Sequence, residues 1–212
     1  MQTLTILPSD ERRWYFSRER RVGGLIPSTA FPGLMQSPIA RVVEGKYWTK
    51  GSERLRDGPL VVTTGEGQTL FRWDIPEGQQ ICFANWEHVV GWSEGVGFQT
   101  IINTQISSLL LRQFFFFVAS GPGTLILEGG GNLQFSGRPD LPRHEFVRYI
   151  AWTRRSRFRV EGSSRMRDLF TLMPLTATVT ATEGVLLDPD HWRREEPLGL
   201  RKLLRWIYRF FP

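Results

Sequence analysis

The side chains most able to do chemistry in this sequence are three widely separated histidines, His88, His144 and His191. Metal sites need ligands at short, regular spacing, and none of the three has a partner at a helical or zinc-finger spacing. His88 follows Glu87, and an adjacent carboxylate and imidazole can exchange protons. We expect His88 instead to be a hydrogen-bonded histidine at the end of a strand.

The glycine and nucleophile motifs of common enzymes are also incomplete. Gly121-Pro122-Gly123 lacks the third glycine of a dinucleotide-binding loop, and no Gly-Lys-Ser/Thr or Gly-x-Ser-x-Gly motif occurs. Cys82 lies in an apolar run, which favours a small buried residue over a nucleophile. We therefore predict that the chain is not an enzyme and holds no metal or cofactor. The alternative is a small-ligand-binding or metal-dependent β-barrel enzyme, although the clustered histidines and carboxylates it needs are missing.

A basic stretch at 152–159 interleaves arginine with aromatic residues. Such a surface can stack on bases and neutralise phosphates, so nucleic-acid binding is one hypothesis. The alternative is an edge strand that its charges protect from aggregation. The nucleic-acid hypothesis assigns contacts to Trp152, Arg154, Arg155, Arg157 and Arg159.

The C-terminal segment changes from a strand pattern to a helical one. From Leu198 onward, apolar residues recur every three or four positions, and arginine and lysine lie largely opposite them. Such an amphipathic helix suits an anionic membrane surface, a groove on a partner protein, or its own domain. The membrane or partner contacts of this helix would be Leu200, Arg201, Lys202, Leu203, Leu204, Arg205, Trp206, Ile207, Tyr208, Arg209, Phe210 and Phe211.

The elements that position these residues are mainly short strands. β-branched and aromatic runs at 60–64, 69–73, 80–84, 98–102 and 124–127 alternate with turns rich in glycine and proline. We predict an all-β sandwich or barrel with a short C-terminal amphipathic helix. The predicted organisation is an N-terminal extension at 1–29, a β domain at 30–190 and the C-terminal helix at 191–212.

Four consecutive phenylalanines at 114–117 constrain the packing of the central strand. Successive side chains of a strand point to opposite faces, so a strand with one wet face would expose two phenylalanines. We expect both faces to be covered, by a second sheet, by the terminal helix or by a second copy of the chain.

Three blocks of the central region carry a resemblance to a known family: Gly-Pro-Leu-Val-Val-Thr at 58–63, Asn-Trp-Glu-His-Val-Val-Gly-Trp at 85–92, and Phe-Val-Ala-Ser-Gly-Pro-Gly-Thr-Leu-Ile-Leu at 117–127. Over roughly residues 30–190 the chain resembles the Altered Inheritance of Mitochondria family (protein twenty-four) and its bacterial relatives. The phenylalanine run and the C-terminal helix depart from the family pattern.

The resemblance implies a β-sandwich or double-stranded β-helix similar to the tryptophan RNA-binding attenuation protein. It also implies self-association and no catalytic residues. Mitochondrial members of the family are linked to the organisation of the inner membrane and its protein complexes. The added C-terminal helix suggests a dedicated partner or surface for this chain.

Charge and composition limit the partners and the compartment. The 212 residues carry 27 lysines and arginines against 21 carboxylates, a formal net charge of +6 that favours anionic partners. A single cysteine excludes an internal disulfide, and no apolar run reaches the length of a signal peptide core or membrane span. We expect a cytoplasmic protein that can lie peripherally on the inner face of the membrane. The leading functional hypothesis is a non-catalytic scaffold that self-associates or joins a larger complex.

Deletion of residues 197–212 tests the role of the predicted helix. If the helix targets the protein, the truncated chain loses its co-fractionation with membranes or with its complex, because the basic apolar surface is gone. The measurement is cell fractionation of both chains. Unchanged fractionation would show that the helix only covers its own domain.

Overall fold

The structure is a computed structural model that describes residues 3–6, 14–17, 22–23, 28–30, 49–52, 60–103, 115–138, 141–161 and 176–189. These residues form eighteen strands and two short 3-10 helices, and every strand pair is antiparallel. The predicted all-β fold is confirmed. No helix in the described part of the chain has the length and apolarity to cross a membrane.

The strands fall into three successive groups of six. The first group contains β1 (Thr3–Ile6), β2 (Trp14–Ser17), β3 (Val22–Gly23), β4 (Ser28–Ala30), β5 (Thr49–Ser52) and β6 (Leu60–Thr63). The second contains β7 (Gln68–Ile75), β8 (Gln80–Phe83), η2 (Trp86–His88), β9 (Val89–Ser93), β10 (Gly97–Ile102), β11 (Phe115–Ser120) and β12 (Gly123–Gly130). The third contains β13 (Gln134–Ser136), β14 (His144–Glu145), η3 (Phe146–Arg148), β15 (Tyr149–Thr153), β16 (Arg157–Glu161), β17 (Thr176–Ala181) and β18 (Val185–Leu187).

All three groups have the same strand pairing. In each group the sixth strand lies between the first and the third, and the fifth strand pairs with the second and the fourth. The second strand also pairs with the third strand of the following group, as β2 does with β9 and β8 does with β15. The chain is therefore a threefold structural repeat, and we call the groups repeats 1, 2 and 3.

The strand register supports the repeat at the level of single residues. A small residue on the third strand lies opposite an aliphatic residue on the sixth in every repeat. These pairs are Gly23 with Val61, Gly91 with Ile126, and Ala151 with Leu186. Repeats 2 and 3 also share an irregularity, because Val90 and Ile150 are both skipped in the pairing as β-bulges are.

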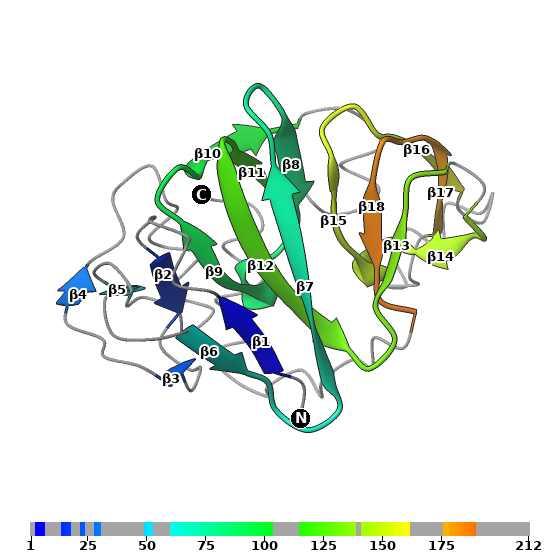
Figure 1. Ribbon diagram of the computed structural model, residues 1–212. Coiled ribbons are helices and arrows are strands. Elements are labelled where there is room, and N and C mark those ends of the chain that lie inside the picture. The colour runs from blue at the N-terminus through cyan, green and yellow to red at the C-terminus, as the bar shows by residue number, and fades with distance from the viewer. Residues whose placement is uncertain are drawn as a thin grey trace, which may run out of the picture.

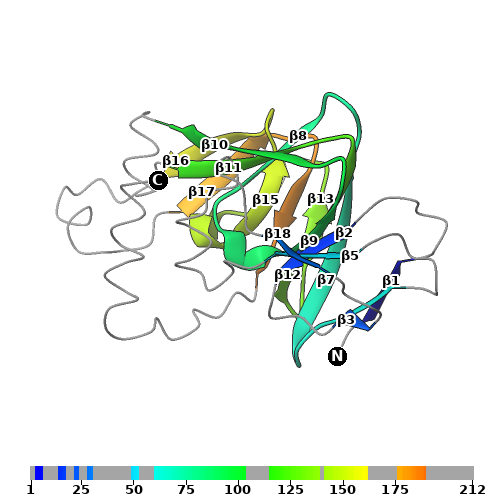
Figure 2. The ribbon, with the colours of Figure 1, turned by 90° about the vertical axis from the view of Figure 1, so that its left-hand side faces the viewer.

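The pairing between repeats produces four sheets, with strand orders β1-β6-β3, β4-β5-β2-β9-β12-β7, β10-β11-β8-β15-β18-β13 and β14-β17-β16. We number them sheets 1 to 4. Sheets 1 and 4 lie at opposite ends of the molecule (Figures 1 and 2). Each of the two central sheets takes three strands from one repeat and three from the next, so neither can form from a single repeat.

Three apolar clusters fill the spaces between successive sheets. Trp14 and Phe16 of sheet 2 pack with Val62 of sheet 1. Trp92 of sheet 2 and Phe83 of sheet 3 belong to the largest cluster, between sheets 2 and 3. A third cluster between sheets 3 and 4 contains Val118, Tyr149, Trp152, Ala177 and Val179.

The phenylalanine run behaves as predicted where the structure describes its side chains. Phe116 is buried in the cluster toward sheet 4, and Phe117 is buried in the cluster toward sheet 2. Both faces of β11 are therefore covered, and the covers are two other sheets of the same chain.

The structure describes part of the predicted N-terminal extension and none of the predicted C-terminal helix. Strands β1 to β3, inside the predicted N-terminal extension, belong to repeat 1, and β2 pairs directly with β9 of repeat 2. The predicted C-terminal helix at 191–212 lies outside the described residues.

The joint between repeats 1 and 2 leaves no room for a side chain at Gly91. A Cβ there would lie 2.5 Å from Cδ1 of Phe16 and 2.7 Å from the carbonyl oxygen of Tyr15. We predict that Gly91→Ala lowers the free energy of unfolding by about 1–3 kcal/mol, because the strand must shift. Gly97→Ala is the matched control, since a Cβ at that position meets nothing within 4 Å. Urea denaturation measures both variants, and equal effects would contradict this account of the joint.

Candidate functional site

The arginines of the predicted nucleic-acid stretch surround a tight turn between β15 and β16. The Ser156 amide donates to the Thr153 carbonyl at 2.9 Å, and the two hydroxyl groups lie 3.0 Å apart. The Ser156 hydroxyl also lies 2.8 Å from that of Thr182, in the connection between β17 and β18. This polar network holds the turn, and it leaves Arg154 and Arg155 at its exposed tip.

Strand β16 continues the basic surface by alternation. Arg157 and Arg159 are exposed, while Phe158 between them packs against Tyr149 and Trp152 with ring centroids 5.2 Å away. The arginines and the phenylalanine thus lie on opposite faces of the strand. Because β16 is an outer strand of sheet 4, its arginines lie along a sheet edge.

Trp152 does not belong to this surface. Its side chain is 6% exposed and packs against Phe116, Phe146 and Phe158. The sequence prediction of Trp152 as a nucleic-acid contact is therefore wrong, because Trp152 faces the sheet interior. The exposed surface therefore contains the cluster of arginine guanidinium groups but not the Trp152 ring that was predicted to stack on bases.

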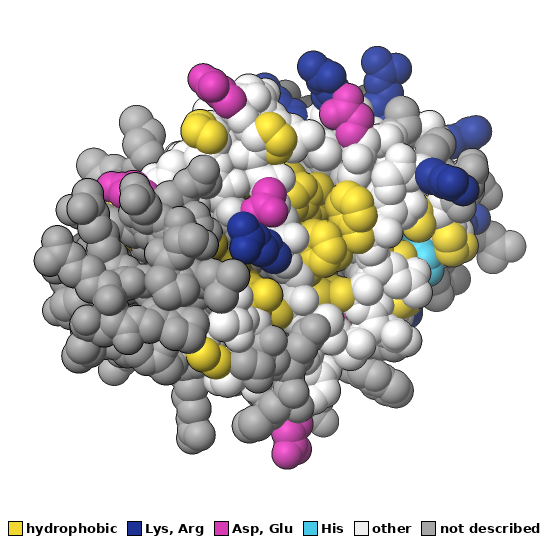
Figure 3. All heavy atoms as spheres, in the orientation of Figure 1, with side chains coloured by type: hydrophobic (Ala, Val, Ile, Leu, Met, Phe, Trp, Pro, Cys, Tyr) yellow, Lys and Arg dark blue, Asp and Glu magenta, His cyan; other side chains and the backbone are white. Residues whose placement is uncertain are grey.

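Two arginines of the turn have partners that differ in charge. Arg155 forms an ion pair with Glu183 at 3.0 Å, and both side chains are largely exposed, so water screens the pair. Arg154 donates a hydrogen bond to the neutral side chain of Gln80. Dark blue side chains gather at the upper right of the molecule in Figure 3.

Comparison of repeats 2 and 3 shows which residues of this region the fold requires. The large aromatic positions are the same, since Trp86, Trp92 and Phe98 of repeat 2 correspond to Phe146, Trp152 and Phe158 of repeat 3. The places of Arg154, Arg157 and Arg159 are instead taken by Glu94, Gly97 and Gln99. Equivalent positions in the same fold thus carry no arginine, so the fold itself does not need the cluster.

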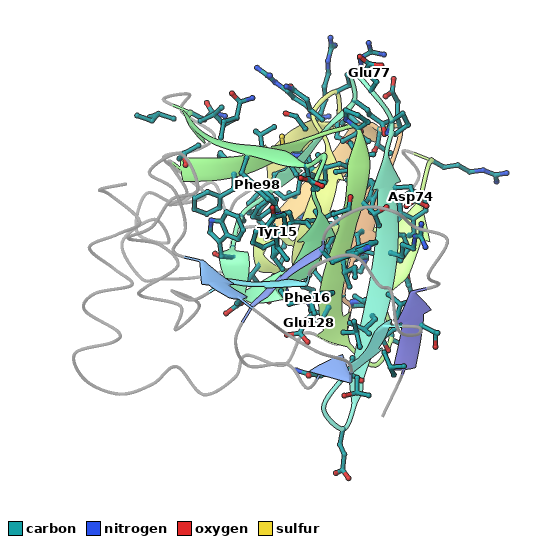
Figure 4. The ribbon with its side chains drawn as sticks, turned by 60° about the vertical axis from the view of Figure 1, so that its left-hand side comes forward. Tyr15, Phe16, Asp74, Glu77, Phe98 and Glu128 are labelled. Carbon is teal, nitrogen blue, oxygen red and sulfur yellow. The ribbon has the colours of Figure 1, made fainter. Side chains whose placement is uncertain are left out.

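The charge difference extends over the whole repeat. The described residues of 68–130 hold one arginine and five carboxylates, whereas those of 131–189 hold seven arginines and four carboxylates. Asp74, Glu77 and Glu128 of the acidic repeat are labelled in Figure 4. The basic character of the protein is therefore concentrated, within the described residues, on repeat 3.

The candidate catalytic side chains have structural roles. The ring of His88 lies 3.0 Å from the Glu128 carbonyl oxygen through Nδ1 and 3.5 Å from the Glu87 carboxylate through Nε2. It is 7% exposed, so the prediction of a hydrogen-bonded histidine is confirmed. No group of three histidine, cysteine or carboxylate side chains that could hold a metal ion occurs among the described residues.

Cys82 is buried, as predicted, in the cluster between sheets 3 and 4. Burial raises the pKa of its thiol to about 11, and the nearby Arg154 cation only partly offsets this. The thiolate, which is the reactive form, is therefore scarce at physiological pH.

Asp188 is a buried residue that sequence analysis did not single out. It is 0% exposed, and its Oδ2 accepts a hydrogen bond from the Gly130 amide at 2.5 Å. By register it corresponds to Glu128, which is 4% exposed at the same place in repeat 2. Its contact ties the turn after β12 to the end of β18, which is a structural role.

An aromatic patch lies at the centre of the face shown in Figure 3. Phe135 of β13 is 49% exposed, and its ring stacks on Phe71 at 5.4 Å and meets the edge of Trp73 at 5.1 Å. Phe71 and Trp73 belong to β7, so the patch joins the edge strands of sheets 2 and 3. Trp73 is buried and Phe71 is half-buried, and a single exposed large apolar side chain such as Phe135 is common on protein surfaces.

The described site thus consists of the arginine cluster formed by Arg154, Arg155, Arg157 and Arg159. The predicted contacts at 200–211, together with His191, lie outside the described residues.

Comparison with known proteins adds evidence for the fold. No protein-family model matches the chain, and no curated protein matches it. Among solved structures, the chain is similar to a crystal structure of a protein from Streptococcus pyogenes, with a TM-score of 0.55 and 13% sequence identity. The similarity covers 98% of this chain and 93% of that one. At this identity it shows a shared fold and carries no conclusion about activity.

Proposed function

We propose that this chain is a non-catalytic scaffold protein that self-associates. The observation that supports the proposal is the way in which its repeats bind one another. Two of the four sheets are completed only when strands of neighbouring repeats pair edge to edge. The repeat is thus an association unit that the chain already uses twice.

The ends of the chain's repeat array support the same proposal. Within the described ranges, sheets 1 and 4 have three strands each, which is half the number in each of the two central sheets. Unpaired strand edges are templates for pairing with another chain. The resemblance to the Altered Inheritance of Mitochondria family also implies self-association. Attachment to a membrane or a larger complex through the C-terminal helix is a further part of this hypothesis.

Self-association is tested by the mass of the purified full-length chain in solution. Light scattering should give a mass above that of one chain, and the mass should rise with concentration, because association follows mass action. High salt should change the result little, since strand pairing and apolar contacts do not depend on surface charge. The mass of a single chain at every concentration would refute the proposal.

A second candidate function is binding to the phosphate backbone of nucleic acid. It is favoured by the exposed arginines at positions where the equivalent strand of repeat 2 has none. Exposed guanidinium groups along a sheet edge neutralise phosphates without reading bases. Because Trp152 is buried, base stacking from that residue is absent and the binding should be independent of sequence.

The double variant Arg157→Gln/Arg159→Gln tests this second function. Binding to a short single-stranded RNA should weaken, and the slope of log affinity against log salt should fall by about 1.4, since each lost phosphate contact contributes about 0.7. The control Arg72→Gln/Arg138→Gln removes the same charge elsewhere. An unchanged slope, or no RNA binding by the original chain at low salt, would exclude the function.

A further inference from the structure

Two strands at the ends of the repeat array, β3 and β14, have one described partner fewer than their counterparts in the other repeats. Among the described residues, β3 pairs only with β6, and β14 pairs only with β17. Their counterparts inside the chain each have two partners. β9 and β15, which correspond to β3, also pair with the second strand of the preceding repeat, and β2 and β8, which correspond to β14, supply that strand.

Each internal joint places an aromatic ring opposite a small residue. Phe16 lies opposite Gly91 at the first joint, and Phe83 lies opposite Ala151 at the second. The ring of Phe16 takes the space that a Cβ on Gly91 would occupy, and both phenylalanines are almost fully buried. Figure 4 shows Tyr15 and Phe16 on β2, at this joint. A ring fitted over a small residue thus sets the register of both joints.

The edges of β14 and β3 carry the two members of such a pair, an aromatic ring on one and a small residue on the other. His144 has the place of Phe83, because His144 lies opposite Ala177 as Phe83 lies opposite Phe117, and β17 corresponds to β11. Gly23 has the place of Gly91, because it lies opposite Val61 of the sixth strand. One free edge therefore presents a ring, and the other presents a residue without a Cβ.

The histidine ring is suited to a buried joint. Burial, and then the Arg148 cation, lower the pKa of His144, so the ring is uncharged at neutral pH. Its Nε2 atom is buried and has no hydrogen-bond partner. Desolvating a neutral ring costs far less than desolvating a charged one.

We propose that β14 of one copy pairs with β3 of a second copy and joins the two chains head to tail. The inference rests on the proposed self-association and names its interface. Sheet 4 and sheet 1 of the second copy would form one sheet of order β16-β17-β14-β3-β6-β1. This is the order of repeat positions found in both central sheets.

The partner is a second copy because the chain does not bring its own two edges together. The sheets that contain β3 and β14 lie at opposite ends of the molecule in both ribbon views (Figures 1 and 2). The two edges are different surfaces, so the contact is heterologous. Repetition of a heterologous contact gives a closed ring or an open filament, and not a twofold dimer.

Cysteine cross-linking of the full-length chain tests the register of this joint. Directly opposite residues of antiparallel strands lie within disulfide range, so Gly23→Cys and His144→Cys are placed to bond across it. An equimolar mixture of the two single variants should give covalent dimers under mild oxidation. The chain that carries both substitutions should give a ladder of larger products. The native Cys82 is buried and is present in every variant, so it contributes equally to all the cross-linking rates.

The control is Gln99→Cys, an exposed position on β10, at the outer edge of sheet 3. Paired cysteines have an effective concentration of about 1 mM, so the Gly23→Cys and His144→Cys mixture should cross-link roughly a hundredfold faster than a mixture with Gln99→Cys. Equal rates, or covalent dimers of Gly23→Cys alone at the same rate, would overturn the head-to-tail joint.

Amide hydrogen exchange of the unmodified chain provides the second measurement, in case a cysteine weakens the joint. Protection should rise with concentration at 22–23 and at 144–145 together. A concentration-dependent mass without protection there would overturn this joint and leave the scaffold proposal standing. A single-chain mass at every concentration would overturn both.

Discussion

The pairing of the second strand of one repeat with the third strand of the next is the interaction on which this structure depends. Backbone amides and carbonyls at a strand edge must find partners when they are buried. The two internal joints meet that requirement with β2–β9 and β8–β15, and they create the two central sheets. The ring-on-small-residue contact at Phe16 and Gly91 selects the register. A slip by one residue would turn every apolar side chain to the wrong face.

The repeats also separate positions that the fold requires from positions that it leaves open. Trp92 and Trp152 are both buried at the same place, which marks that position as part of the packing. Glu94 and Arg154 share one place at the tip of an equivalent turn, where either charge is tolerated. A head-to-tail array of chains would present the arginine cluster at regular intervals. Such repetition raises the avidity for a long polyanion without any new contact.

Much of the fold was predictable from local patterns. Runs of β-branched and aromatic residues between glycine turns predicted the strands of 60–103, and the phenylalanine run predicted that β11 is covered on both faces. The burial of Cys82 was also predictable, because the cysteine lies in an apolar run, and the hydrogen-bonded state of His88 was expected as well. The threefold repeat was missed. Its signal is the matching pair of triplets Trp86, Trp92, Phe98 and Phe146, Trp152, Phe158, in which each aromatic residue follows the previous one six positions later. Beyond these rings the repeats share their strand pairing, and equivalent positions such as Glu94 and Arg154 differ in charge.

The sequence by itself determined the class of structure, the alternation of Arg157, Phe158 and Arg159, and the basic excess that favours anionic partners. Local periodicity and composition are enough for such properties, since they depend on neighbouring residues. The tertiary structure decided which side of each strand is interior, and so it removed Trp152 from the surface that its arginine neighbours form. It also decided that, within the described residues, β3 and β14 lack the partner strand that their counterparts in the other repeats have. Strand partners lie far apart in sequence, and no local pattern specifies which edge stays unpaired.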